Sequence, residues 1–416
     1  MEKYIERLYA KDVGVFNELE IIFNPRFNFI AGPNGSGKTS ILKCIALALC
    51  PSSVRNIRCQ DSSLVWFDNV VGVTRYRVGL GEGWVLNAEN YRSGNLKSWV
   101  KPLNEQGIIS INSSNLENNN INITPLILGA YRRIEYKRID GMHREINFIE
   151  QRKKYINSGF NNIDGGELTN VKQWMINRYF QTDKKWALIY KNNWNWIIEN
   201  INKLGPNNSE LYFKEIKRDL EPIFTLNGID CFLEEISAGF QAFLSLVFAI
   251  VEWIEGTNEE KDTYIPEATG TVVIDELDVH LHPEWQLTIR DSLSTFFPKL
   301  QFITTTHSPH LIASAGSGEL IILPELSRNL NICPSEKTYS GWNTDEILED
   351  VMGVKSLENK LYATMLNEAM DCVGKKDSEK LQSIINELKN IVHPSNTILQ
   401  VLQIKFAALE LGNNND

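Results

Sequence analysis

The sequence predicts an α/β fold around a parallel sheet, and three observations support this prediction. Hydrophobic runs of strand length, rich in β-branched residues, recur near both ends of the 416-residue chain. These runs are continuous rather than alternating, as in parallel strands that are covered on both faces. One of them leads directly into a glycine-rich turn and a helix-forming segment, and two others end in polar side chains. Ligands of α/β proteins gather at such strand ends.

The elements follow from local patterns along the chain. Short β-rich runs separated by glycines, from Val54 to Trp99, predict an antiparallel sub-sheet, and the Asn- and Ser-rich segment from Ser110 to Asn122 predicts an exposed loop. The remaining strands and helices are predicted from apolar runs: strands at Ile5–Tyr9, Leu19–Phe23, Phe27–Ala31, Thr124–Tyr131, Thr271–Ile274, Leu300–His307 and Leu320–Leu323, and helices at Ser40–Leu49 and Phe240–Ile254.

Changes in composition divide the chain into four predicted segments. An N-terminal lobe (1–133) and a C-terminal lobe (228–325) would form one head, separated by a polar helical arm (134–227) and followed by a helical extension (326–416). The arm carries Trp174, Trp186, Trp194 and Trp196, for which we favour the core of a small domain over a base-stacking surface.

Composition limits the class of protein. Hydrophobic residues make up 43% and charged residues 23%, with a formal net charge of -10, as in globular proteins and unlike disordered, collagen-like or disulfide-stabilised ones. The 6 cysteines show no CxxC spacing, which is typical of a reducing compartment. Because neither a signal peptide nor an uncharged apolar run of membrane-spanning length is visible, we expect a cytoplasmic protein.

A phosphate-binding loop is the strongest motif. The segment at 32–39, GPNGSGKT, fits G-x-x-x-x-G-K-[ST] at every fixed position. Its glycines let successive N–H groups point at phosphate oxygens, and the next helix adds its positive end. The alternative is a chance glycine-rich turn. The residues expected to bind ATP here are Asn34, Gly35, Ser36, Gly37, Lys38, Thr39 and Ser40.

Two acids and a histidine follow other strands. Asp275 and Thr39 would bind Mg²⁺, and Glu276 would polarise the attacking water. His307 is placed to sense the γ-phosphate. Taken alone, two acids after a strand are more often a solvated strand end, and a lone histidine is more often structural.

The segment before the second long helix is a weaker signal. Ser237 and Gly239 offer a hydroxyl and bare N–H groups at a helix start, and Gln241 follows them. A serine N-cap is commonplace, but this one lies between the phosphate loop and the acidic strand end.

The order of these motifs resembles the ABC-type ATPases of the SMC and RecF class, over a little under half of the chain. Within that class the run at 274–286, IDELDVHLHPEWQ, resembles the Septu-type (PtuA-like) antiphage ATPases, including retron-associated forms. Segments 128–133 and 341–348 are similar to further parts of these proteins.

The resemblance implies an ABC/SMC-type head that dimerises around ATP. Ser237, Gly239 and Gln241 would then serve the ATP of a second copy, and Asp278 would lie on the loop that crosses the interface. The segment Ile-Ser-Ala-Gly-Phe-Gln at 236–241 would be the signature motif of this class. It differs from the Leu-Ser-Gly-Gly-Gln of transporters, which argues against a transporter. The glutamine that usually contacts the metal is not identifiable, with Gln60 as the one early candidate.

Two further features remain open. His280 and His282 have the spacing of a metal-binding pair, but an interface loop is the favoured interpretation. The segment 131–154 carries a net charge of +4 and interleaved aromatic residues. It is either a solvated face or a surface for DNA or retron RNA–DNA, through Arg132, Arg133, Lys137 and Arg138.

The favoured function is the ATPase subunit of a Septu- or retron-type antiphage complex. It would hydrolyse ATP slowly and control a separate nuclease of the HNH type (PtuB-like), because no nuclease motif is visible in this chain. A RecF/SMC-like repair or recombination ATPase is the alternative. A scaffold that holds ATP but seldom hydrolyses it is the third hypothesis.

Overall fold

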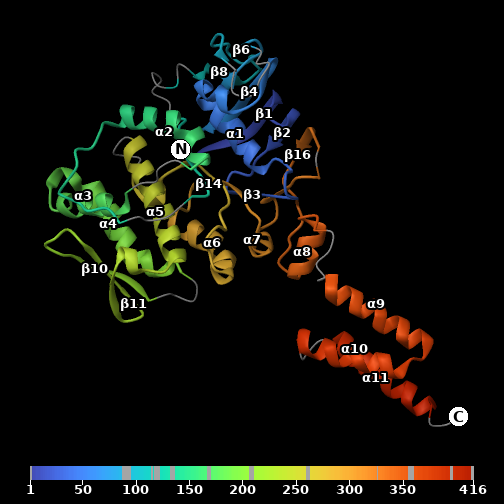
Figure 1. The fold of residues 1–416 in the computed structure, drawn as a ribbon. Helices are drawn as coiled ribbons and strands as arrows, with labels where there is room; N and C mark the ends of the chain where they lie inside the picture. Colours follow the sequence, from blue (N-terminus) through green and yellow to red (C-terminus); the bar gives the residue numbers. More distant parts are fainter. Residues whose placement is uncertain are drawn as a thin grey trace. The chain divides into compact units, whose positions relative to one another are not determined.

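The computed structural model describes residues 2–86, 95–113, 116, 122–131, 136–165, 170–205, 210–258, 263–325, 327–354, 360–393 and 397–413. They divide into two compact units, 1–353 and 354–416. The first unit holds all four sheets and the helices up to α8 (Thr344–Asp350) (Figure 1).

A five-stranded parallel sheet lies at the centre of the first unit. Its strand order is β15-β3-β14-β13-β9, and every pair is parallel. The strands are β3 (Phe27–Ala31), β9 (Leu126–Leu128), β13 (Gly270–Ile274), β14 (Leu300–Thr305) and β15 (Leu320–Ile322). β3, β9 and β14 are buried along their whole length, as the continuous apolar runs require. The α/β prediction is therefore confirmed.

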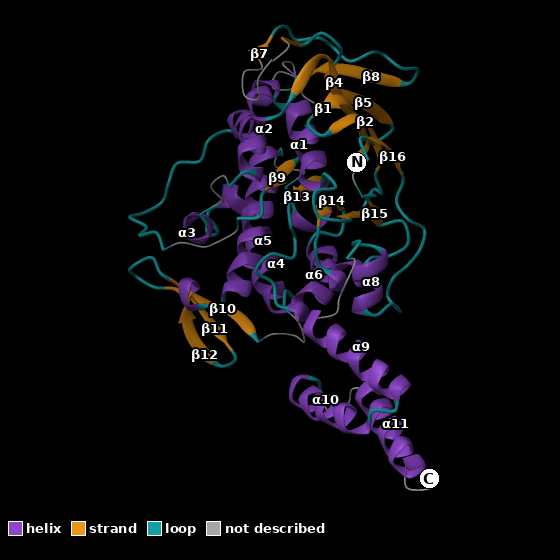
Figure 2. Cartoon of the chain, turned by 45° about the vertical axis from the view of Figure 1, so that its right-hand side comes forward, coloured by secondary structure: helices purple, strands orange, loops and turns teal. Residues whose placement is uncertain are grey.

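A second sheet of six strands covers the other side of helix α1 (Lys38–Leu49), which packs between the two sheets (Figure 2). Its order is β16-β2-β1-β4-β5-β8. The strands are β1 (Lys3–Val13), β2 (Phe16–Ile22), β4 (Cys59–Val71), β5 (Thr74–Leu80), β8 (Ile108–Asn112) and β16 (Asn329–Ile332). The pairs from β2 to β5 are antiparallel, and β4 with β5 lies in the segment for which an antiparallel sub-sheet was predicted, whereas both edge strands join in parallel.

The loop predicted from Ser110 to Asn122 is wrong at its start. β8 takes the first part of this range, and Ser113 donates a buried hydrogen bond to the Ala48 carbonyl of α1 (2.7 Å). The polar composition predicted exposure wrongly, because the hydroxyl groups of Ser110 and Ser113 donate hydrogen bonds to backbone carbonyls within the protein. Residues 114–115 and 117–121 lie outside the described residues.

The insertion contains strands as well as helices. Helices α2 (Phe148–Ile163), α3 (Val171–Gln181) and α4 (Leu188–Asn200) precede a three-stranded antiparallel sheet of β10 (Leu211–Ile216), β11 (Pro222–Leu226) and β12 (Ile229–Phe232). Trp174 and Trp194 are buried and stack at 6.1 Å between ring centroids, so the core interpretation holds for these two. Trp186 is 63% exposed, and the interpretation is wrong there.

Three further helices precede or follow strands of the parallel sheet along the chain. α5 (Ala238–Thr257) is long and apolar enough to cross a membrane by length and composition, but 72% of that window is buried within the protein. α6 (Pro283–Phe296) follows β13, and α7 (Pro309–Ser314) follows β14. α1, α6 and α7 follow β3, β13 and β14, so the predicted phosphate loop, acidic residues and His307 lie after the carboxyl ends of these parallel strands.

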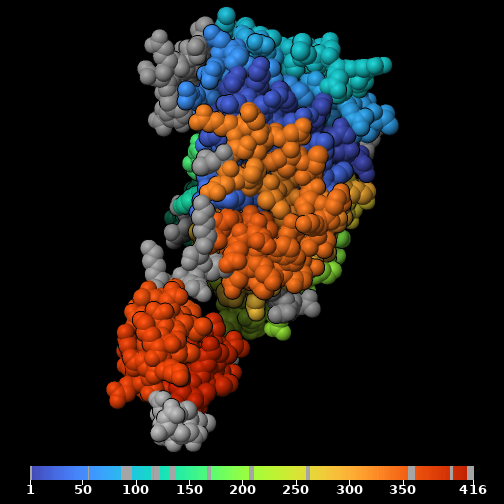
Figure 3. All heavy atoms as spheres, turned by 90° about the vertical axis from the view of Figure 1, so that its right-hand side faces the viewer, coloured from blue at the N-terminus to red at the C-terminus, as the bar shows by residue number. Residues whose placement is uncertain are grey.

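Residues 326–353 continue the first unit. Figure 3 shows chain after β14, in orange, against the blue N-terminal strands, in agreement with the pairing of β16 with β2. The second unit consists of α9 (Lys360–Lys375), α10 (Ser378–Ile391) and α11 (Thr397–Asn413), with a small core of its own. The predicted helical extension therefore includes one strand, which its short and polar sequence conceals.

Candidate nucleotide-binding site

The loop between β3 and α1 has the backbone of a phosphate cradle. Gly32 has φ +143° and Gly37 has φ +98°, both in the region that favours glycine. A Cβ on Gly32 would lie 2.6 Å from the Leu323 carbonyl oxygen, and one on Gly37 would lie 2.8 Å from Phe16. Neither position tolerates a side chain, so the sequence motif corresponds to a real steric requirement.

Lys38 folds back over this loop. Its Nζ donates to the carbonyl oxygens of Gly32 (2.8 Å) and Pro33 (2.9 Å), and the residue is 5% exposed. Burial lowers the pKa of Lys38, while the nearby carboxylates of Asp275 and Glu276 oppose that shift. The ammonium is therefore held at the loop, with weak carbonyl partners that a phosphate group can replace.

Asp275 connects the ends of three elements. Thr39 donates to the Asp275 carboxylate, with 3.2 Å to either oxygen. Thr305, at the end of β14, donates to the same carboxylate at 2.6 Å. Asp275 is itself buried. The structure thus brings the two predicted metal ligands together, with Thr305 as a positioning residue that the sequence did not single out.

Glu276 has a strained backbone. Its φ is +50°, and its N–H donates to the Thr305 hydroxyl oxygen (2.7 Å). A non-glycine residue in the left-handed region costs about 1–2 kcal/mol, and such strain is concentrated at functional sites. The turn directs Glu276 away from the course of β13 while Asp275 stays buried.

Asp278 and His307 lie together after β13 and β14. The Asp278 carboxylate accepts from the Thr306 hydroxyl (2.7 Å) and from the His307 backbone N–H (3.2 Å). Burial, followed by the charge of Lys38, lowers the pKa of His307, which favours the neutral imidazole. His307 is therefore within the electrostatic reach of the phosphate loop.

A second layer supports this histidine. Ser308 donates to Gln286 Oε1 (2.6 Å), and Gln286 Nε2 donates to the Leu281 carbonyl (2.9 Å). These bonds tie α6 to the turn after β14. Neither residue was predicted to belong to the site, although Gln286 ends the 274–286 run that resembles the Septu-type ATPases.

The signature residues lie elsewhere in the chain. Ser237 is exposed at the start of α5, and the described hydrogen bonds do not connect it or Gly239 to the phosphate loop. The Gln241 side chain is used locally, donating to the carbonyls of Glu234 (2.9 Å) and Ile236 (2.7 Å). A Cβ on Gly239 would lie 3.3 Å from the His280 carbonyl oxygen, so this helix start abuts the loop after β13.

Other predicted residues are not brought to this site. Gln60 is exposed in β4, and among the described residues no group of three or more His, Cys, Asp or Glu is arranged to bind a metal ion around His280 and His282. Lys137 and Arg138 are exposed, and Arg138 pairs with Asp140 at 3.4 Å. Arg132 and Arg133 lie outside the described residues.

The residues present fit ATP and Mg²⁺. The buried Ser36 hydroxyl has no hydrogen-bond partner, which suits a phosphate oxygen. The first N–H groups of α1 have no intrahelical partners and also suit phosphate. Thr39 and Asp275 supply the hydroxyl and carboxylate oxygens that Mg²⁺ prefers, and the metal would neutralise phosphate charge. Asn34, Gly35 and Ser40 complete the loop on its exposed side and in the first turn of α1.

One known protein resembles this chain along nearly its whole length, and another resembles a shorter part of it. It is 26% identical to the Septu protein PtuA of Bacillus thuringiensis over 97% of this chain and 98% of that protein. It is 32% identical to the retron Vc95 probable ATPase of Vibrio cholerae over 29% of this chain and 24% of that protein. The predicted resemblance to Septu and retron ATPases is therefore confirmed.

Solved structures and family models also match. The SMC head domain from Thermotoga maritima is similar with a TM-score of 0.45 and 17% identity, covering 81% of this chain and 100% of that one. A model described as AAA domain matches residues 7–65, and a model described as AAA ATPase domain matches residues 87–312. Since the AAA ATPase domain model matches more than half of this chain, the chain belongs to the AAA ATPase domain family.

Proposed function

We propose that this chain is the ATP-hydrolysing subunit of a prokaryotic antiphage defence complex of the Septu or retron type. The observation that carries this proposal is the similarity to Septu protein PtuA along nearly the whole of both chains. The site supports it, because the phosphate loop, Asp275, Glu276 and His307 all follow the carboxyl ends of strands in the parallel sheet. We expect a cytoplasmic protein with slow turnover.

The roles of the residues follow from their positions. Lys38 and the loop N–H groups would bind the phosphates, and Thr39 with Asp275 would hold Mg²⁺. Glu276 would act as the general base toward water, and neutral His307 would donate a hydrogen bond to the γ-phosphate. The network from Thr305 to Asp275 and Glu276 would fix the geometry of this group.

A second copy of the chain would complete the site. Among the described hydrogen bonds, none joins Ser237 or Gly239 to the phosphate loop of the same chain, and Ser237 is exposed at the start of a long helix. These properties support a head-to-head dimer in which the signature of one copy reaches the ATP of the other. Gln241 would hold the signature turn in shape, and Asp278 would fix the loop next to that interface.

The effector would be a separate nuclease subunit, of the HNH type (PtuB-like). Nucleic acid, as DNA or retron RNA–DNA, would bind through Arg132, Arg133, Lys137 and Arg138. The exposure of Lys137 and Arg138 supports this part of the proposal.

Two measurements on Glu276→Gln test the function. Turnover should fall by about 10²–10³-fold, because the general base is lost while ATP is still bound, and light scattering should show an ATP-dependent dimer. Glu284→Gln, an exposed carboxylate at the start of α6, is the matched control. Turnover equal to that of the wild type would remove Glu276 from the mechanism.

The same tagged variant, isolated from its native host, tests the biological role. A stoichiometric small nuclease, with or without a bound RNA–DNA, would support the defence complex. Replication or recombination proteins in place of a nuclease would instead favour a repair ATPase.

A further inference from the structure

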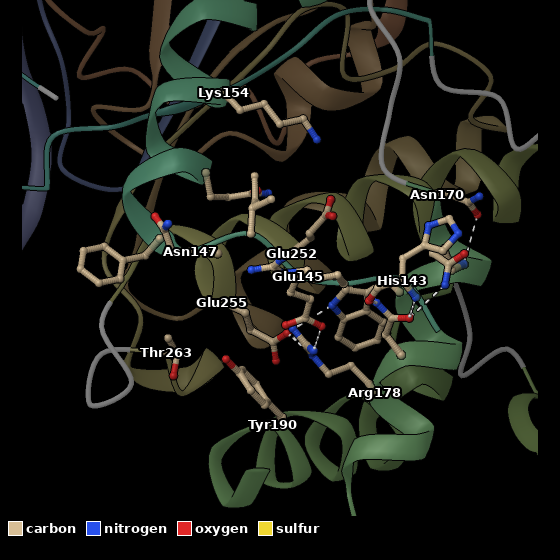
Figure 4. Close-up of a pocket in the computed structure, with 18 of the residues that line it drawn as sticks. His143, Glu145, Asn147, Lys154, Asn170, Arg178, Tyr190, Glu252, Glu255 and Thr263 are labelled. Atoms are coloured by element: carbon tan, nitrogen blue, oxygen red, sulfur yellow. Dashed lines mark hydrogen bonds and ion pairs between the residues drawn. The ribbon is translucent and has the colours of Figure 1, made fainter. Parts of the chain in front are cut away.

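A cavity lies away from the nucleotide site. It has a volume of about 900 Å³ and is formed where the insertion meets the last turns of α5 (Figure 4). Its walls come from residues 143–148, from α2, α3 and α4, and from Glu252, Glu255, Gly256, Asn258 and Thr263. None of the residues assigned to ATP lines it. A volume of this size suits a small-molecule ligand.

One side of the cavity favours an anion. Helix α2 begins after its cap Asn147, and helix α3 begins after its cap Asn170, and both caps line the cavity. Each helix start adds a positive end to the lining, and Figure 4 places Asn147 and Asn170 on opposite sides of the view. Lys154 extends from α2 over the cavity in Figure 4, and Arg144 is an exposed cation of the same wall. This combination matches a phosphate group.

A buried carboxamide supplies an independent indication of a ligand. Gln173 is 8% exposed, and its Nε2 donates to the carbonyl of Gly141 and to Asn177 Oδ1, both at 2.9 Å. Its Oε1 is buried without a hydrogen-bond partner. Leaving a buried acceptor unpaired costs about 1–3 kcal/mol, so an N–H group of a ligand would stabilise this wall.

The lining is rich in groups that recognise nucleobases. Carboxamides pair with the hydrogen-bonding edges of bases, and aromatic rings stack on their faces. The carboxamides of the wall are Asn147, Gln151, Asn170, Gln173, Asn177 and Asn258, and its aromatic residues include Phe148, Trp174 and Tyr190. Such a wall suits a planar heterocycle better than a simple sugar or a lipid.

A hydrogen-bonded network of charged and polar side chains lies at the floor of the cavity. Buried Glu255 accepts from Arg178 Nε (2.6 Å), Trp174 Nε1 (3.2 Å) and Asn193 Nδ2 (2.9 Å). Arg178 also pairs with Glu145, which offsets that carboxylate. With Glu252, the lining holds three carboxylates, and Arg178, Lys154 and Arg144 are three cations, so the formal charges of the lining balance.

We propose that this cavity binds a phosphorylated nucleoside. The phosphate would lie beside Lys154 of α2, and the base would lie against the carboxamide wall at Gln173. The ligand is either a free nucleotide or the 5′-terminal nucleotide of a nucleic acid strand, since both present the same chemistry.

Binding is measured by equilibrium dialysis on the full chain carrying Lys38→Ala, which disables the phosphate loop. The probes are the nucleoside monophosphates and a short single strand with a 5′-phosphate. Lys154→Glu should weaken binding by at least about tenfold, because it places an anion next to phosphate. Gln173→Leu should weaken binding by about five- to tenfold through loss of the acceptor.

Lys191→Glu is the matched control, because Lys191 is exposed on α4 and does not line the cavity. Its affinity should stay within about twofold of the parent. With an intact phosphate loop, Lys154→Glu should keep wild-type ATP turnover and thermal stability, which separates this test from the proposed function.

The outcomes distinguish the ligand sources. Monophosphates that bind and are lost with Lys154→Glu would support a free nucleotide, and strand binding alone with the same loss would support a strand end. Absence of binding by both probes, or affinities that Lys154→Glu and Gln173→Leu leave unchanged, would overturn the proposal.

Discussion

Glu276 combines a catalytic proposal with a measurable backbone strain. Because its φ is +50°, the residue type at this position affects stability independently of its carboxylate. Glu276→Gly and Glu276→Ala should both abolish turnover. Glu276→Gly should nevertheless be more stable than Glu276→Ala by about 1 kcal/mol in urea unfolding, since glycine adopts this conformation without strain. Equal stabilities would show that the turn carries no strain.

Thr305 and Thr304 offer a matched pair on one strand. The Thr305 hydroxyl donates to Asp275 and accepts from the Glu276 N–H, whereas the buried Thr304 hydroxyl has no partner. Thr305→Val should cost about 1–3 kcal/mol of unfolding free energy and lower turnover, because the Glu276 N–H loses this acceptor and the buried Asp275 carboxylate loses this donor. Thr304→Val should be neutral or stabilising. Similar losses in both variants would contradict the positioning role of Thr305.

At the scale of elements, a buried ion pair joins the insertion to the head. Arg178 of α3 and Glu255 of α5 are both buried, and burial raises the pKa of Glu255. Arg178→Met should destabilise the first unit by about 3–5 kcal/mol, because the remaining carboxylate is left buried without a cation. Adding Glu255→Gln should restore part of this loss, as chemical denaturation of the double variant would show.

Arg138 is the corresponding surface control. Its partner Asp140 is 86% exposed at the side chain, so Arg138→Met should change stability by less than about 0.5 kcal/mol. A large effect there, or none at Arg178, would mean that burial does not determine the contribution of these pairs.

At the scale of the whole molecule, the two units have separate hydrophobic cores. A chain ending at Gly353 should therefore fold and bind ATP with an affinity within about twofold of the full chain, measured by isothermal titration calorimetry. Loss of ATP binding in a soluble 1–353 chain would show that the C-terminal unit takes part in the site.

The sequence predicted the fold where the apolar pattern was unambiguous. β3 was predicted with its observed bounds, because Phe27–Ala31 is a continuous buried run next to a glycine loop. β16 was not predicted, because the short alternating sequence Asn-Leu-Asn-Ile of this edge strand resembles a loop. The phosphate loop and Asp275 could be recognised from motifs, whereas Thr305 acts through contacts that no spacing reveals. The cavity at the insertion depends on residues such as Gln173 and Glu255, which only the packing of α3 against α5 brings together.

The position of β3 between β14 and β15 also has a consequence for biosynthesis. The strand that leads into the phosphate loop emerges early from the ribosome, but its second neighbour follows about 290 residues later. At typical elongation rates of roughly 5–20 residues per second, β3 waits about 15–60 s for its partners. The nascent chain therefore carries an incomplete apolar strand throughout most of its synthesis, and a product that terminates before β14 lacks Thr305 and His307 of the site.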